Sequence, residues 1–266
     1  MATSGNKMFL GTNRSESMYF GLRGLAFLLI ALAFNGCDKS ETTQDNGQLT
    51  LGFSARYGTV PFLGLLPFPY GGVKSIKINK LDFYLTGITL LSPSGNIELA
   101  EAALIDVTGN SEEDRSVGLK GLKKGEYTGI KFNVGVKPDL NKKLPKDFKS
   151  DHVLSSTSHY WEAWDSYIFS KIEGVLDTKG DKLYDLGFAV HTGTDACLAT
   201  VQIDKSFRLT DNQTFSFNLD LDVEKIFLHN GQYFDLESSP LNHNPSNIPT
   251  LILFATHLAG AIQLKN

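Results

Sequence analysis

The side chains best suited to chemistry gather in the second half of the chain. All six histidines lie at or after position 152, and the two tryptophans, Trp161 and Trp164, stand three residues apart. His159 lies two residues before the first of them. Imidazole is the commonest protein ligand for metals and suits copper and zinc. Two or three histidines brought together by the fold would therefore make a metal site, whereas one alone would not.

Four histidines are candidate metal ligands. His191 stands on the polar face of a predicted strand that ends just before the Thr-Gly-Thr-Asp segment at residues 192–195; the alternative is a polar residue on a solvated face. His159 could equally be an ordinary loop histidine. His243 lies in a turn-like Asn-His-Asn-Pro segment, and His257 lies on an apolar helical segment. On such an apolar helical segment, a histidine is more often a hydrogen-bonded core residue than a metal ligand. The chain has no HExxH or paired CxxC motif that would select a ligand set.

The tryptophan pair has two possible arrangements. At their spacing, Trp161 and Trp164 would share one face of a helix but point to opposite faces of a strand. Core packing is the alternative to a role in a site. Cys197 is the only cysteine besides Cys37; it could be a soft metal ligand beside His191, or a buried unreactive thiol. No GxSxG elbow is present, so the sequence gives no support to a hydrolase triad.

Residues 1–36 are typical of a secretory signal peptide. Arg23 precedes an apolar run that is too short to span a membrane, and Cys37 follows that run closely. The pattern predicts a bacterial lipoprotein with a lipidated Cys37 and a polar tether over residues 37–47; ordinary secretion is the alternative. Met18 could be the true start. The predicted location is the cell envelope, on its periplasmic or cell-surface face, with the lipid in the membrane.

The rest of the chain, residues 48–266, is expected to form one all-β domain. Apolar and polar side chains alternate with a period of two, most cleanly over residues 214–223, and short turn motifs separate the runs. This pattern predicts an antiparallel β-sandwich. The net charge of −4 leaves no basic footprint for nucleic acid.

The breaks in the alternation predict the remaining elements. Residues 58–72 and 138–158 lack periodicity and are expected to be long surface loops. Short helical pieces are expected over residues 223–228 and over the C-terminal residues 250–264, which follow a proline suited to a first helical turn.

Several segments resemble the MbnP-like family, periplasmic copper-binding proteins associated with methanobactin and related to surface copper proteins of methanotrophs. The central match is Trp161-Glu-Ala-Trp164, followed by Tyr167-Ile-Phe169 and Glu173-Gly174. Phe188-Ala-Val-His191-Thr-Gly193 matches a later family element, and Leu81-Asp-Phe-Tyr-Leu an earlier one. The resemblance covers most of residues 48–260.

The resemblance implies a β-sandwich that binds copper through histidines, with His191 as the foremost ligand. In some members a tryptophan near the site is oxidised to kynurenine, with a di-haem peroxidase-like protein as partner; Trp161 and Trp164 are the candidates here. Those members carry a histidine two residues after the oxidised tryptophan, where this chain has Ala163 and Ser166. His159 could substitute from the other side.

We therefore expect a lipid-anchored, extracytoplasmic protein that binds copper for storage, delivery or acquisition and turns over no substrate. His191 and His159 would be ligands, with His243 or His257 completing the set. The alternative function is a binding module without a metal, which would use the aromatic surface around Trp161 and Trp164 for a glycan, a peptide or a protein.

Overall fold

The computed structural model describes residues 45–244 and 247–265. The predicted signal peptide, the lipidation site Cys37 and all but the end of the predicted tether lie outside the described residues. Within the described ranges, no helix has the length and apolar character needed to cross a membrane.

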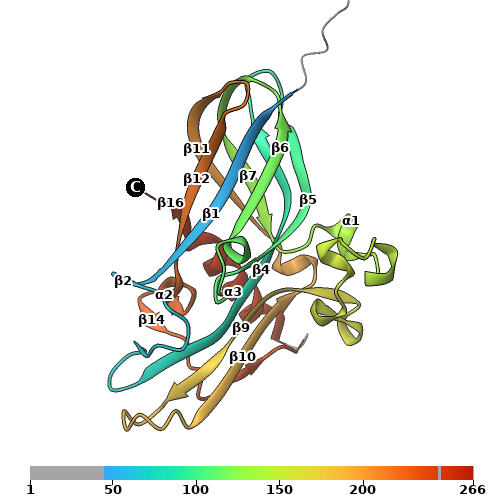
Figure 1. Cartoon of the computed structure of the whole chain (residues 1–266). Helices are drawn as coiled ribbons and strands as arrows, with labels where there is room; N and C mark the ends of the chain where they lie inside the picture. The colour runs from blue at the N-terminus through green and yellow to red at the C-terminus, as the bar shows by residue number, and fades with distance from the viewer. Residues whose placement is uncertain (1–44, 245–246, 266) are drawn as a thin grey trace, which may run out of the picture. The chain divides into compact units, whose positions relative to one another are not determined.

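Two β-sheets form the body of the domain (Figure 1). The first sheet has the strand order β16 (Ile262–Leu264), β12 (Thr214–Asp222), β1 (Gly47–Tyr57) and β2 (Val60–Pro61), with β6 (Ser116–Leu122) also pairing with β1. The second has the order β11 (Ala199–Leu209), β7 (Gly125–Val134), β4 (Ser75–Leu91), β9 (Ser166–Asp177), β10 (Leu186–Gly193) and β15 (Leu241–Asn242). Attached to this second sheet are β3 (Phe68–Pro69), β5 (Ile97–Asp106) and β8 (Tyr160–Trp161).

The prediction of an all-β, antiparallel sandwich is confirmed in its fold class, and most of the strand pairings are antiparallel. Two pairings are parallel, β1 with β12 and β10 with β15. A separate hairpin joins β13 (Leu228–His229) to β14 (Gln232–Tyr233). The long strand β4 pairs with β9 through its first half and with β7 through its second half. The strands β9 and β10, which carry the candidate site, are therefore anchored to the body of the domain through β4.

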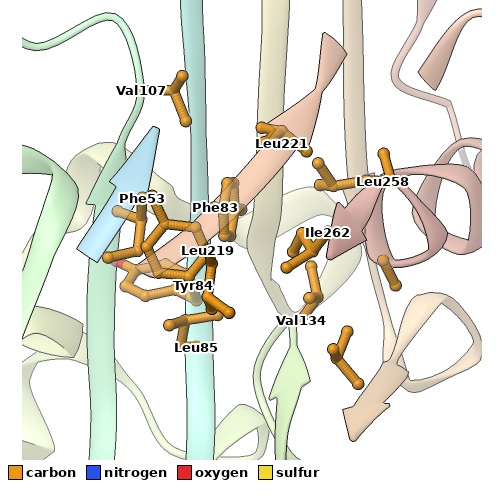
Figure 2. Close-up of a cluster of buried hydrophobic side chains, with 14 of the residues drawn as sticks. Phe53, Phe83, Tyr84, Leu85, Val107, Val134, Leu219, Leu221, Leu258 and Ile262 are labelled. Atoms are coloured by element: carbon orange, nitrogen blue, oxygen red, sulfur yellow. The ribbon is translucent and has the colours of Figure 1, made fainter. Parts of the chain in front are cut away.

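The hydrophobic core is formed by strands in which buried and exposed residues alternate. On β12, Phe217, Leu219 and Leu221 are fully buried, while Ser216 and Asn218, which alternate with them, are exposed. Figure 2 shows the cluster that they join, to which β1, β4, α3 and β16 also contribute. Burial of so many apolar side chains is the main stabilising term of such a domain.

The helices differ in part from the prediction. They are α1 (Pro138–Asn141), α2 (Val223–Ile226) and α3 (Ile248–Gly260), together with the 3₁₀ turns η1 (Glu113–Arg115), η2 (Pro145–Asp147), η3 (Val153–Ser155), η4 (Thr157–His159), η5 (Glu162–Trp164) and η6 (Asp195–Cys197). The predicted helix over residues 250–264 is correct only as far as Gly260. The three residues Ile262–Leu264 instead extend the first sheet by pairing with β12, because strand pairing outweighs a weak local helix preference.

The expectation of a plain surface loop over residues 138–158 is wrong. The segment contains α1, the 3₁₀ turns η2 and η3 and the start of η4, and it buries Leu140 and Leu154 completely. The glycine-rich segment over residues 58–72 fits the expectation only around the exposed Leu63 and Leu65, because it also contains β2 and β3 and buries Phe68 and Tyr70.

Candidate metal site

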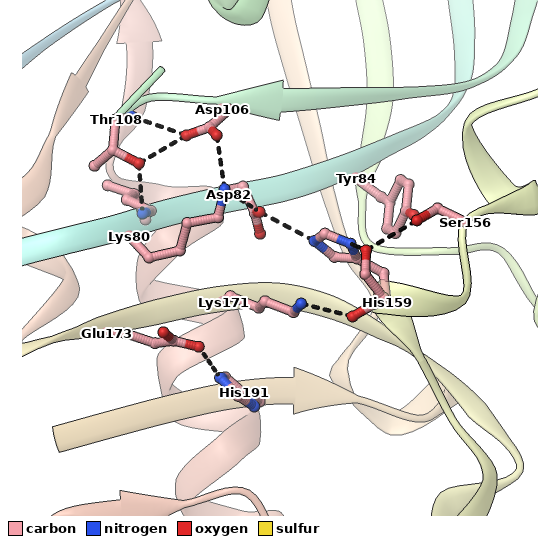
Figure 3. Close-up of polar contacts among 12 residues, drawn as sticks. Lys80, Asp82, Tyr84, Asp106, Thr108, Ser156, His159, Lys171, Glu173 and His191 are labelled. Carbon is pink, nitrogen blue, oxygen red and sulfur yellow. Dashed lines mark hydrogen bonds and ion pairs between the residues drawn. The ribbon is translucent and has the colours of Figure 1, made fainter. Parts of the chain in front are cut away.

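His191 lies on the outer face of the second sheet, on β10. Its neighbour Val190 points into the core and is fully buried, so strand alternation turns His191 to the opposite face. The Nε2 atom lies 2.7 Å from Oε1 of Glu173 on the adjacent strand β9 (Figure 3). The Nδ1 atom is buried and has no hydrogen-bond partner among the described residues. One ring nitrogen is thus held by a carboxylate and the other is free.

Burial lowers the pKa of His191 below its usual value, and the charges of Lys171 and His243 act in the same direction. The Glu173 carboxylate opposes this shift but does not cancel it. A neutral ring that donates a hydrogen bond from Nε2 to Glu173 keeps Nδ1 unprotonated. This is the form of histidine that binds a metal ion.

His243 reaches His191 through the pairing of two short strand segments. β15 runs parallel to β10 with Val190 opposite Asn242, so the next residue, His243, lies beside His191. Their ring centroids are 5.9 Å apart. The Trp161 ring contacts both, at 5.3 Å from His243 and 6.3 Å from His191. Of the four predicted ligands, the structure brings these two together.

The tryptophans adopt neither of the two regular arrangements considered for them. Trp161 ends the short strand β8, and Trp164 lies in the 3₁₀ turn η5, which ends at Asp165 with φ of 49°. The turn stacks the two indole rings, with centroids 5.1 Å apart and planes within 6°. Gly193 permits this packing, because a Cβ atom there would lie 2.6 Å from the Trp164 ring. We call His191, His243, Glu173, Trp161 and Trp164 the histidine–tryptophan site.

His159 lies elsewhere and has both ring nitrogens occupied. Its Nε2 atom is 3.0 Å from Oδ2 of the fully buried Asp82, and its Nδ1 atom is 3.0 Å from the Ser158 hydroxyl. Lys80 pairs with the same Asp82 oxygen at 2.9 Å (Figure 3). Burial raises the pKa of Asp82, but His159 and Lys80 outweigh it and hold that pKa below its usual value. The geometry gives His159 a structural role, tying residues 157–161 to β4.

The other predicted side chains also lie outside the histidine–tryptophan site. His257 on α3 lies next to His229, with ring centroids 5.5 Å apart. Cys197 is buried on η6, and burial raises the pKa of its thiol. Across the described residues, no group of three or more His, Cys, Asp or Glu side chains is arranged to hold a metal ion. The site therefore offers two imidazoles.

Glu173 is the site residue to which the sequence assigns no role. It belongs to the Glu-Gly motif, and its place on the polar face of β9 is readable from the alternation with the buried Ile172 and Gly174. The sequence pattern does not show that β9 pairs with β10. This pairing brings the Glu173 carboxylate to His191.

Comparison with known proteins supports the sequence resemblance. The sequence profile of the MbnP family matches residues 46–247. The chain belongs to the MbnP family. The family as a class is extracytoplasmic and is associated with methanobactin.

Among solved structures, the chain is similar to MbnP from Methylosinus trichosporium. The TM-score is 0.44 and the sequence identity 16%, over 66% of this chain and 76% of that protein. No curated protein gives a significant sequence match.

Proposed function

We propose that this MbnP family member binds a copper ion at the histidine–tryptophan site, outside the cytoplasm, for storage, delivery or acquisition of the metal and without turning over a substrate. His191 Nδ1 and His243 are the ligands. The observation that carries the proposal is the pairing of a buried, unpartnered imidazole nitrogen with a second imidazole 5.9 Å away.

The spacing of the two rings suits a shared ion. A bond of about 2.0–2.1 Å from a metal to an imidazole nitrogen puts each ring centroid about 3 Å from the ion, and two such rings about 5–6.5 Å apart. The observed spacing falls in that range. Imidazole donors suit copper, and they exclude calcium and magnesium, which require oxygen ligands.

The other residues of the site support the ligands. Glu173 fixes the orientation of the His191 ring and makes Nδ1 more basic, as carboxylates commonly do behind metal-bound histidines. Trp161 contacts both imidazoles, with its plane at 68° to the His191 ring and 53° to the His243 ring, and so helps to hold the two rings in place. With only two protein ligands, water or a delivered chelator would complete the coordination.

The lipid anchor and the envelope location belong to the same proposal. The apolar run followed by Cys37 supports a lipidated cysteine as the attachment to the membrane. Because β1 begins at Gly47, a tether of residues 37–47 would join the lipid directly to the first strand.

Oxidation of a tryptophan is proposed at Trp161 in preference to Trp164, because Trp161 contacts both histidines. A di-haem peroxidase-like partner would supply the oxidant. Intact mass of the protein isolated from its native cells tests this step, since conversion to kynurenine adds about 4 Da. An unshifted mass, with native copper bound, would contradict it.

Anaerobic copper titration against a chelator tests the site itself. The variants His191→Ala and His243→Ala should each bind copper at least tenfold more weakly than the wild type. His152→Ala is the matched control, because His152 stacks on Phe148 and is not part of the site. Equal affinity in all four proteins would exclude copper binding at this position.

The metal-free binding module remains the second candidate, because Trp164 also lines a polar pocket of about 410 Å³ together with Asn141, Lys142 and Asp195. Trp161 is less suited to such a ligand, since its ring is stacked on Trp164 and contacts His243. A change in tryptophan fluorescence with oligosaccharides or peptides, and none with copper, would favour this function.

A further inference from the structure

A second pair of imidazole rings lies on elements that take no part in the histidine–tryptophan site. His229 ends β13, and His257 lies in the last turn of α3. Their ring centroids are 5.5 Å apart and their planes differ by 25°. The sequence separates these two histidines by 28 positions, and only the packing of α3 against the β13–β14 hairpin region brings them together.

The His257 ring contains an unpartnered buried nitrogen. In the part of the chain that the structure describes, three buried side-chain polar atoms have no hydrogen-bond partner, and two of them are Nδ1 of His191 and Nδ1 of His257. Buried polar groups are almost always hydrogen-bonded, so such an atom calls for an explanation. Each of these two nitrogens belongs to a ring that lies next to a second imidazole.

The surroundings favour the neutral form of the His257 imidazole. Burial lowers the pKa of His257, and the neighbouring His229 acts in the same direction, while the nearby backbone of Ile226 opposes them. His229 is exposed, and its Nε2 atom accepts a hydrogen bond of 3.2 Å from the Asn230 amide, which leaves Nδ1 without a partner in the described residues. An ion can therefore reach the His229 ring from solvent.

The donor set limits the kind of ion. The aromatic ring of Phe234 lies 5.7 Å from His257 and 6.2 Å from His229. Within the described ranges, neither histidine is hydrogen-bonded to a carboxylate, in contrast to His191 and His159. A pair of imidazoles beside an aromatic ring suits ions of the Cu²⁺, Ni²⁺ and Zn²⁺ group and does not suit calcium or magnesium.

We propose that His229 and His257 form a second metal site, which binds one divalent ion of the copper–zinc group with water as the remaining ligands. The ring spacing of 5.5 Å lies within the range of about 5–6.5 Å expected for two imidazoles on one ion. The site adds to the proposed function and does not depend on it, because it shares no residue with the histidine–tryptophan site.

Two measurements on the full chain with Cu²⁺ separate the sites. Equilibrium dialysis followed by atomic absorption counts all bound copper, whereas tryptophan fluorescence reports on the first site, since both tryptophans of the chain lie there. We expect two copper ions per wild-type chain. His229→Ala and His257→Gln should each bind one ion and keep the full fluorescence quenching. His191→Ala should also bind one ion but lose the quenching.

The outcomes separate the second site from the proposed function. If His229→Ala and His257→Gln bind as much copper as the wild type, the second site does not exist. His229 is exposed, so its replacement should leave the fold intact, which circular dichroism checks; His152→Ala should keep both ions. A wild type that shows no quenching, yet loses one ion in His229→Ala, would contradict the proposed function and support the second site.

Discussion

Glu173 determines which nitrogen of His191 is available to a metal. Its carboxylate holds Nε2 at 2.7 Å and so leaves Nδ1 free. In Glu173→Gln the amide can present either a donor or an acceptor, so the ring loses its fixed tautomer and part of its basicity. We expect copper affinity to fall by about tenfold or more, with little change in the free energy of unfolding because the Glu173 side chain is 38% exposed.

Competition titration against a copper chelator measures this loss. Glu98→Gln is the matched control, because Glu98 pairs with Lys137 away from the site and should keep wild-type affinity. Unchanged affinity in Glu173→Gln would mean that His191 is oriented by packing alone.

His159 should matter for stability and not for metal binding. Replacing it by alanine leaves the fully buried Asp82 with Lys80 as its only side-chain partner among the described residues. Removing a hydrogen-bond partner of a buried carboxylate is costly, so we expect a loss of about 3 kcal/mol in the free energy of unfolding. Urea denaturation measures it. Lys124→Ala breaks the exposed pair with Asp211 and should cost less than about 1 kcal/mol.

If His159→Ala were as stable as the wild type and lost more copper affinity than His191→Ala, His159 would be a ligand after all.

At the level of single residues, the sequence identifies candidate side chains but not their partners. The spacing of Trp161 and Trp164 and the strand alternation at His191 are readable from the chain. The choice of His243 over His159 or His257 cannot be read from the sequence. It follows from the parallel pairing of β15 with β10 and from which ring nitrogens are already hydrogen-bonded.

The tryptophan stack depends on the end of β10. A Cβ atom on Gly193 would lie 2.6 Å from the Trp164 ring and 2.9 Å from the Tyr167 carbonyl oxygen. Gly193→Ala must therefore displace the indole from Trp161, at a cost of about 1–3 kcal/mol for overpacking. Near-ultraviolet circular dichroism and urea denaturation should both detect the change.

Gly187→Ala is the matched control for this substitution. Gly187 lies on the same strand, and a Cβ atom added there would meet no neighbouring atom within 4 Å, so the tryptophan signal should stay unchanged. An unchanged signal in Gly193→Ala as well would show that the two indoles do not need this close contact.

The local sequence pattern predicts most helices and strands correctly. It fails where contacts with other parts of the chain determine the structure. The alternation on β12 predicted its buried and exposed faces correctly except at the end of the strand, where Asp222, expected on the polar face, is buried. The end of the C-terminal helix was not readable, since Ile262–Leu264 becomes a strand by pairing with β12. The segment 138–158 looked like a loop because its buried Leu140 and Leu154 follow no regular period.

For the whole molecule, the period-two pattern predicts the sandwich. It does not predict which strands pair or in which direction they run. Alternation predicts strands with one buried face, and many short strands predict two packed sheets. Nothing in the pattern of β1 or β12 indicates that they pair in parallel. The period of the sequence pattern shows which face of a strand is buried, but not which strand lies beside it. The fold class was therefore predictable and the strand order was not.

The stability of the metal-free protein should decrease as the pH falls below neutral. Burial lowers the pKa of both His191 and His257 below the unfolded value of 6.5. The unfolded chain therefore binds more protons than the folded protein between that value and the lower folded ones, so acid favours unfolding in this window. Each histidine contributes a slope of at most about 1.4 kcal/mol per pH unit.

Urea denaturation without metal at pH 7.5, 6.5 and 5.5 measures this slope. The double variant His191→Gln/His257→Gln should lose most of it, since glutamine does not titrate, whereas His152→Gln should keep it. Bound copper should steepen the dependence in the wild type, because protons and metal compete for the same nitrogens and only the folded protein holds the ion. A wild-type stability that is constant or rises toward pH 5.5 would show that neither ring is held neutral by the fold.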